Sequence, residues 1–162
     1  MTFRCGSCGE DHDGLPDLGS TYPDPYLAVP EEERAARTHF TPDACIVRDE
    51  DGEHFFVRGI IQIPVHGRDE AFGIGAWVSQ SQVNFERYVS GRAKEPTFGW
   101  LVTHIAHYAE PTFLLKTRVH FRVEPLRPNI ELEPTAHPLA VEQRVGIPLS
   151  RAWEIVHRYL PS

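Results

Sequence analysis

The chain has 162 residues, 41% of them hydrophobic, and a formal net charge of −7 at pH 7. This length suits one domain with a core of its own, and the acidic balance argues against nucleic acid as a partner. No apolar run reaches the ~18 residues that span a membrane. The N-terminal segment lacks the apolar centre of a signal peptide, so we expect a cytoplasmic protein with reduced cysteines.

The first 30 residues are rich in Gly, Pro and Asp, which predicts an irregular arm. Pro30 and the three glutamates after it predict a short helix that ends near Arg37, because proline suits the first helical position and acidic side chains suit its positive end. We therefore expect one domain over residues 1–162. Residues 1–40 form the arm and short helix, and residues 44–162 form a sheet with C-terminal helices.

Strand patterns begin near Ala44, and the dipeptide Asp51-Gly52 predicts a hairpin turn. The expected strands cover 45–48, 54–65, 71–79, 98–108, 112–123 and 129–133. Gly73 and Gly75 indicate a bulge or a close approach of another backbone. Helical spacing predicts helices over 81–89, 137–146 and 149–160. The fold class is α+β, with a largely antiparallel sheet of about five to six strands, helices on one face and an N-terminal zinc-knuckle arm.

The clearest candidate site is the pair Cys5 and Cys8, whose C-x-x-C spacing can turn two thiolates onto one metal ion. Cys45 offers a third thiolate, and His12 is the nearest candidate for the fourth ligand. His137 is the main rival of His12. These residues predict a structural zinc site; the alternatives are a metal-free reduced pair and a redox pair.

A second candidate lies on the predicted strand 112–123. Its even positions carry a basic row, which we define as Lys116, Arg118, His120 and Arg122. Alternation places these side chains on one face of the sheet, where Arg118, His120 and Arg122 could bind an anion. Arg58 and Gln62 are candidates to join them from a neighbouring strand. The alternative is an ordinary solvated face whose charges are paired locally.

The remaining polar and aromatic residues predict structure rather than chemistry. His104 and His107 are expected to be hydrogen-bonded structural histidines. The three tryptophans Trp77, Trp100 and Trp153 lie in apolar patterns and are expected in the core. The sequence contains no glycine-rich phosphate loop, nucleophile elbow or H-E-x-x-H zinc motif.

Several segments together resemble one bacterial family, the domain of unknown function 2199. The segments are Phe3 to His12, Asp43-Ala44-Cys45, Phe56-Val57-Arg58-Gly59, Gly75 to Ser79 and His137-Pro138-Leu139-Ala140. The resemblance covers nearly the whole chain. It implies a family with no assigned activity, and it gives weight to the cysteines and to His12 and His137 without assigning them a role.

Two classes of function fit these observations. The first is a non-enzymatic binding or regulatory protein whose zinc knuckle fixes the arm to the sheet, with another protein as a candidate partner. The second is a small metal-dependent enzyme that acts on an anionic substrate. Four protein ligands on the metal would favour the first class, and three ligands with a water would favour the second.

Overall fold

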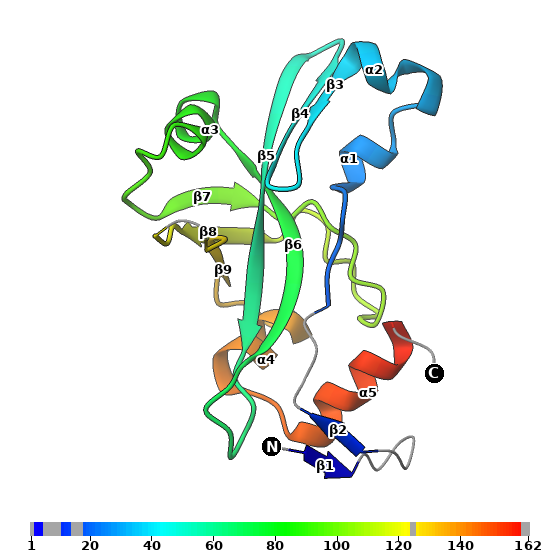
Figure 1. The fold of residues 1–162 in the computed structure, drawn as a ribbon, viewed down its shortest axis with the longest axis vertical. Helices are drawn as coiled ribbons and strands as arrows, with labels where there is room; N and C mark the ends of the chain where they lie inside the picture. The colour runs from blue at the N-terminus through cyan, green and yellow to red at the C-terminus, as the bar shows by residue number, and fades with distance from the viewer. Residues whose placement is uncertain (1, 5–10, 14–17, 124–125, 160–162) are drawn as a thin grey trace.

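The computed structural model describes residues 2–4, 11–13, 18–123 and 126–159 (Figure 1). The two shortest segments form an antiparallel pair, β1 (Thr2–Arg4) and β2 (Asp11–Asp13). This pair lies near the end of the molecule that carries the last helix (Figure 1). The side chains are described for residues 18–123 and 126–158.

The first helices confirm the predicted short helical segment. Helix α1 (Asp24–Leu27) precedes a 3₁₀ turn (Glu31–Glu33), which runs directly into α2 (Arg34–Arg37). Pro30 precedes the glutamates, as proline does at many helix starts. The two helices lie at the end of the molecule opposite to β1 and β2 (Figure 1).

Three strands follow in a meander: β3 (Thr38–Phe40), β4 (Ala44–Asp49) and β5 (Gly52–Ile63). Asp49 pairs with Gly52 across the predicted turn, and Gly52 has a φ of 120°. Strand β6 (Phe72–Gln80) then pairs antiparallel with residues 55–63 of β5. These elements confirm the predicted hairpin and the strand over 71–79.

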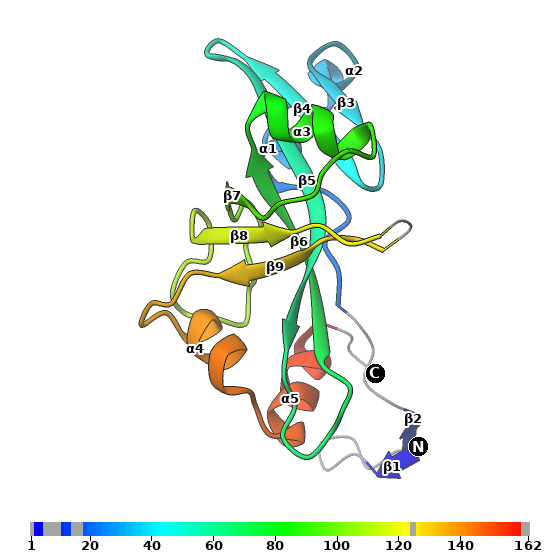
Figure 2. The same ribbon diagram turned by 90° about the vertical axis from the view of Figure 1, so that its left-hand side faces the viewer.

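The remaining strands cross this ribbon, as Figure 2 shows. Helix α3 (Gln82–Val89) begins at the N-cap Ser81, whose hydroxyl accepts from the Asn84 N–H at 3.2 Å. It leads to β7 (Thr97–Trp100), β8 (Lys116–His120) and β9 (Asn129–Leu132). Strand β8 lies between β7 and β9 and is antiparallel to both.

The sheet curls until β6 meets the end of β7. Its described strands number seven, and the order is β3-β4-β5-β9-β8-β7, with β6 also paired to β5. A bridge between Val78 and Leu101 joins β6 to the end of β7, so β5, β6, β7, β8 and β9 form a closed ring. The pairing of Ile60 with Asn129 is parallel. The prediction of a largely antiparallel sheet is confirmed, and the curl adds one parallel pair.

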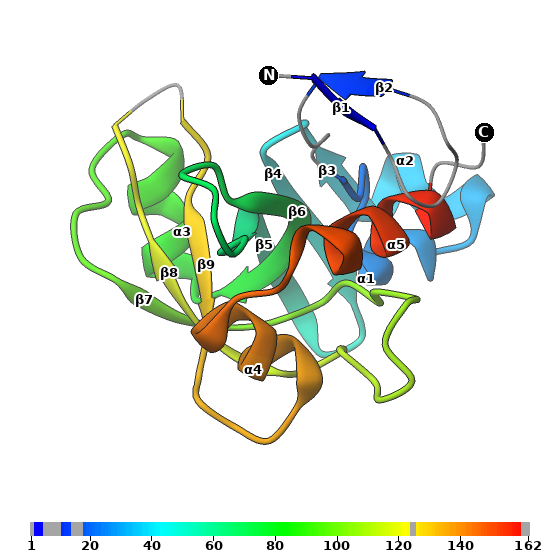
Figure 3. The same ribbon diagram turned by 90° about the horizontal axis from the view of Figure 1, so that it is seen from below.

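Two helices complete the chain, and Figure 3 shows them following one another below the sheet. Helix α4 (Pro138–Val145) has His137 as its N-cap and Gly146, with a φ of 83°, as its C-cap. Helix α5 (Leu149–Tyr159) buries Ala152, Trp153, Ile155 and Val156. Both helices agree with the sequence prediction. In the described part of the chain, none of the helices combines the length and apolarity needed to cross a lipid bilayer.

The core has two parts, one on each side of the β5–β6 ribbon. The larger part fills the curl and receives Phe85 from α3, Leu139 from α4 and Ile155 from α5. The smaller part lies beside α1 and consists of Val29, Cys45, Val47, Phe56, Trp77 and Val102, with Tyr26 and Phe40 against it. Helices therefore cover two faces of the ribbon rather than one.

Two strands are shorter than their sequence patterns predict. Strand β8 begins at Lys116 rather than near residue 112, because Leu114 has a positive φ of 68°. The Leu114 N–H donates to the Leu101 carbonyl, and the Leu101 N–H donates to the Leu115 carbonyl. Two residues of one segment, Leu114 and Leu115, therefore lie opposite the single residue Leu101. This arrangement is a β-bulge. Strand β7 ends at Trp100, and the chain beyond Leu101 turns to bond with Trp77 of β6.

Candidate functional site

The predicted zinc ligands fall in different parts of the molecule. Cys5 and Cys8 lie outside the described residues. His12 belongs to β2, where its backbone pairs with that of Phe3. The neighbouring pair Arg4 and Asp11 holds the two ends of the cysteine segment side by side.

Cys45 lies in the smaller core and has no exposed surface. It belongs to β4, at a distance from β2 along the long axis (Figure 1). Burial raises the pKa of its thiol to about 12, so the group stays protonated at neutral pH. The surroundings of Cys45 are aliphatic and aromatic, and the core around it contains no second metal-ligating side chain among its described members. The described structure does not bring Cys45 to β2.

His137 uses both ring nitrogens within the fold. Its Nδ1 accepts from the Leu139 N–H at 3.0 Å, so Nε2 carries the proton and faces the Pro111 carbonyl at 3.1 Å. The ring therefore ties α4 to the loop before β8. Among the described residues, which exclude both N-terminal cysteines, no group of three or more His, Cys, Asp and Glu side chains could hold a metal ion.

The basic row is present on the outer face of β8, but its members have different neighbours. Lys116 Nζ lies 5.9 Å from the centre of the Trp100 ring. His120 Nε2 lies 3.0 Å from a carboxylate oxygen of Glu131. Arg122 follows the strand, and its Nε donates to the Arg127 carbonyl at 2.6 Å. The row therefore does not converge on a single point. Among the described residues, Arg118 and Lys116 are the members of the row without a hydrogen-bond or ion-pair partner.

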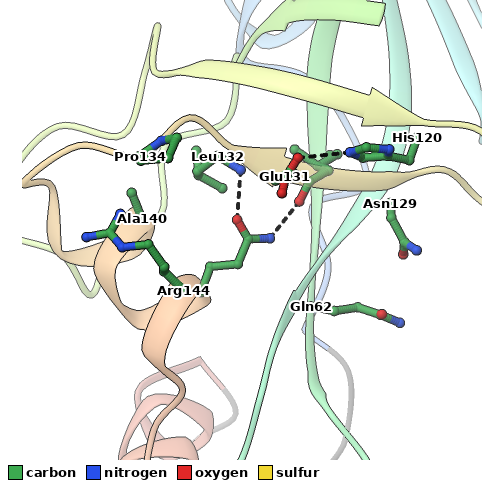
Figure 4. Close-up of a pocket in the computed structure, with 10 residues that line it drawn as sticks. Gln62, His120, Asn129, Glu131, Leu132, Pro134, Ala140 and Arg144 are labelled. Atoms are coloured by element: carbon green, nitrogen blue, oxygen red, sulfur yellow. Dashed lines mark hydrogen bonds and ion pairs between the residues drawn. The ribbon is translucent and has the colours of Figure 1, made fainter. Parts of the chain in front are cut away.

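A cleft of about 520 Å³ opens where β5 and β9 diverge (Figure 4). His120 and Gln62 both line it, as the sequence suggested, whereas Arg58 instead donates to the Pro42 carbonyl at 3.4 Å. Gln143 of α4 fills the strand gap: its amide nitrogen donates to the Ile130 carbonyl at 2.8 Å and its oxygen accepts from the Leu132 N–H at 2.7 Å.

Two aromatic residues beside the basic row are exposed, which the sequence did not predict. Phe98 and Trp100 of β7 are 47% and 39% exposed, so the assignment of Trp100 to the core is wrong, whereas Trp77 and Trp153 are buried as expected. Gly99 between them faces inward. Alternation along the strand could have predicted this exposure, because a buried Gly99 places both of its neighbours on the outer face.

These aromatic residues pair across the strands with the basic row. Phe98 is opposite Arg118, and Trp100 is opposite Lys116. Side chains in such positions lie about 5 Å apart at their Cβ atoms. Each exposed ring therefore has a cationic neighbour on the same face.

A groove of about 480 Å³ continues from Phe98 towards α3. Three cationic side chains line it: Arg87 of α3, and Arg92 and Lys94 of the segment that follows the helix. Arg92 Nε donates to the Ser90 hydroxyl at 3.1 Å. Glu95 is the acidic residue in the lining. We call the surface formed by Arg87, Arg92, Lys94, Phe98, Trp100, Lys116 and Arg118 the basic-aromatic face.

Cations elsewhere on the described chain have partners. Ion pairs hold Arg37, Arg48, Arg68, Arg127, Arg151 and Arg158. Backbone carbonyls accept from Arg34, Arg58 and Arg122. The described Lys and Arg side chains with neither kind of partner lie on the basic-aromatic face, apart from Arg144 at the cleft of Figure 4. Unpaired charge is therefore concentrated on one surface of an acidic molecule.

Comparison with protein families gives one finding. Residues 4–147 match the model of a family described as an uncharacterized protein conserved in bacteria, domain of unknown function 2199. Comparison with curated proteins and with solved structures finds no match.

Proposed function

The chain belongs to the bacterial family of uncharacterised proteins named domain of unknown function 2199, and we propose that it is a non-enzymatic binding protein for an anionic ligand or partner. The ligand-binding surface in this proposal is the basic-aromatic face. One observation carries it: the Lys and Arg side chains without acidic or carbonyl partners gather beside two exposed aromatic rings.

Physical chemistry supports this use of the surface. A protein of net charge −7 has many carboxylates that can pair with a surface arginine. Each such surface ion pair contributes little to the free energy of folding. Guanidinium groups left without such partners can donate to oxyanions in two parallel bonds. Exposed aromatic rings add apolar contact area next to those donors.

The test is calorimetric titration with inorganic pyrophosphate at low ionic strength. We expect wild type to bind and Arg118→Gln/Lys94→Gln to lose most of the affinity. Arg144→Gln is the matched control, because Arg144 is also exposed and lacks an acidic partner but lies outside the face. Equal affinity in all three proteins would contradict the proposal.

We further propose that Cys5 and Cys8 bind zinc with His12 as the third protein ligand. The C-x-x-C spacing supports the metal, and the pairing of Arg4 with Asp11 supports a short connection that closes around it. Cys45 is left out of this ligand set, because its side chain is buried in the smaller core, at a distance from β2 along the long axis. Metal binding would join the two ends of the cysteine segment and order the arm.

Elemental analysis of protein purified without added metal tests the zinc site. Wild type and Cys45→Ala should each carry about one zinc per chain, and Cys5→Ser/Cys8→Ser should carry almost none. Metal loss in Cys45→Ala, with the fold intact by circular dichroism, would return Cys45 to the ligand set. Metal-free wild type would remove the site altogether.

A further inference from the structure

We propose that the basic-aromatic face binds nucleotide units, with phosphate on its cations and a base on Phe98 or Trp100. This inference rests on the proposed anion-binding function and names its ligand class. The shared chemistry is a phosphate next to a planar ring, which occurs both in free nucleotides and in single-stranded nucleic acid.

The negative net charge is not evenly distributed along the chain, and one region of the chain is basic. Between residues 87 and 127 the chain carries seven Lys or Arg and three Asp or Glu. The rest of the chain is therefore more negative than the molecule as a whole. Exposed charges act over about 8–10 Å at physiological salt, so a ligand on this face is governed by its nearby cations. The argument against nucleic acid from overall charge does not apply to this surface.

The order of side chains across β7 and β8 fits a nucleotide. Each exposed ring has a cation directly across the strand pair, Arg118 beside Phe98 and Lys116 beside Trp100. Successive outward positions on a strand are about 6.7 Å apart. A base can stack on a ring while its phosphate meets the adjacent cation, and every base has a face suited to such stacking.

The groove next to Phe98 extends the same surface. Arg87, Arg92 and Lys94 offer further phosphate donors beyond the first ring. Three carboxylates border the face. Glu95 lies in the groove, Glu133 follows β9 opposite Lys116, and Glu131 lies across from Arg118 but is paired to His120 at 3.0 Å. The cations outnumber these carboxylates, and Arg118 remains available.

An acidic peptide is the competing ligand, and the aromatic rings decide against it. Carboxylates need only the cations, so an acidic peptide would leave Phe98 and Trp100 exposed or would use them only as apolar surface. A peptide could also bind by joining a strand edge, but β7 has no free edge there because β8 lies on one side and β6 meets its end on the other.

The experiment measures fluorescence anisotropy of a labelled single-stranded oligothymidylate of about 12 nucleotides, a length within the usual range for one binding module. The same label on duplex DNA and on a glutamate oligomer gives two comparison arms, and unlabelled thymidine monophosphate competes in a third. We expect preference for the single strand, with affinity that falls steeply between about 50 and 200 mM salt.

The variants separate stacking from charge. Phe98→Ala/Trp100→Ala should weaken oligonucleotide binding about tenfold or more while leaving pyrophosphate binding nearly unchanged. Arg118→Gln should weaken both ligands, and Arg144→Gln should change neither. Trp100 is also a reporter: a stacked base should quench its emission in wild type, and Trp100→Phe should abolish that change because Trp77 and Trp153 are buried.

The outcomes are distinguishable. Competition by thymidine monophosphate alone at similar affinity per site would identify free nucleotide as the source, and tight binding only of the oligomer would identify single-stranded nucleic acid. Equal binding of the glutamate oligomer, with no effect of Phe98→Ala/Trp100→Ala, would overturn this inference and leave the anion-binding function standing. Absence of pyrophosphate binding and oligonucleotide binding alike would overturn both.

Discussion

At the scale of single residues, alternation along a strand predicted burial well where the strand is regular. Thr117 and Val119 of β8 are fully buried, and Lys116 and Arg118 face outward, as the pattern of the sequence predicts. The alternation does not extend to Phe113, which is 43% exposed, because the bulge at Leu114 shifts the pattern before the strand begins. A positive φ at a leucine has no sequence signature.

We predict that Val119→Asp destabilises the protein by several kcal/mol, because it places an unpaired carboxylate in the middle of the curled sheet. Chemical denaturation monitored by circular dichroism measures the change. Lys116→Asp, three residues earlier on the outer face, is the control and should cost less than about 1 kcal/mol. Equal losses in the two variants would mean that the faces of β8 are not as described.

We predict that His107 makes the protein sensitive to acid. Burial lowers the pKa of His107 to about 4, and the nearby Arg151 adds to the effect. The unfolded chain takes up this proton near pH 6.5, whereas the folded chain does so only near pH 4, so stability falls as the pH drops through this window. The free energy of unfolding should drop less in His107→Gln than in wild type, by about 1–2 kcal/mol. Parallel pH profiles of the two proteins would contradict this.

At the scale of elements, the sequence predicted what local signals encode. Helical spacing placed α3 and α4, and the Asp51-Gly52 turn placed the β4–β5 hairpin. The close approach predicted at Gly75 is also confirmed, since its N–H donates to the Leu18 carbonyl. The curl was not predictable in this way, because it depends on strands that lie far apart in the sequence.

Gly99 is the residue on which the β6–β7 junction depends. A Cβ atom at this position would collide with the Ser79 carbonyl oxygen of β6. We predict that Gly99→Ala lowers stability by about 2 kcal/mol or more and loosens the ring at this junction. Thermal denaturation and hydrogen exchange of the Leu101 amide measure both effects.

Gly19→Ala provides the control for that variant. Its added Cβ would meet only the flexible end of Arg58, at 3.3 Å, so the protein should keep nearly its full stability. A stable Gly99→Ala protein with slow exchange at Leu101 would show that β6 and β7 need no such close contact.

At the scale of the whole molecule, the overall charge did not predict where the cationic side chains gather. Overall charge pointed away from polyanions, while the groove between α3, the segment after it and Phe98 of β7 gathers unpaired cations next to those of β8. The sequence predicted Arg118 as a site residue but did not predict Phe98, Trp100 or the groove. Phe98 and Trp100 resembled core residues, and the groove is formed by two separate segments.

The ring of strands also predicts how the molecule unfolds. Because β5 contacts both parts of the core and pairs with β4, β6 and β9, neither end of the sheet can open alone without disrupting it. We expect one thermal transition for residues 18–159, with equal calorimetric and van't Hoff enthalpies. Two resolved transitions in differential scanning calorimetry would show that the chain contains two independent units.

The side chain of Gln143 has a consequence for how the protein behaves in concentrated solution. Its side-chain nitrogen donates to the Ile130 carbonyl and its oxygen accepts from the Leu132 N–H, along a margin of β9 that none of the described strands covers. An uncovered strand margin offers its backbone groups to another chain and is a starting point for aggregation. The Gln143 side chain makes the two hydrogen bonds that a neighbouring strand would make at this point. It therefore blocks intermolecular strand pairing along this margin, while the cleft beside it stays open.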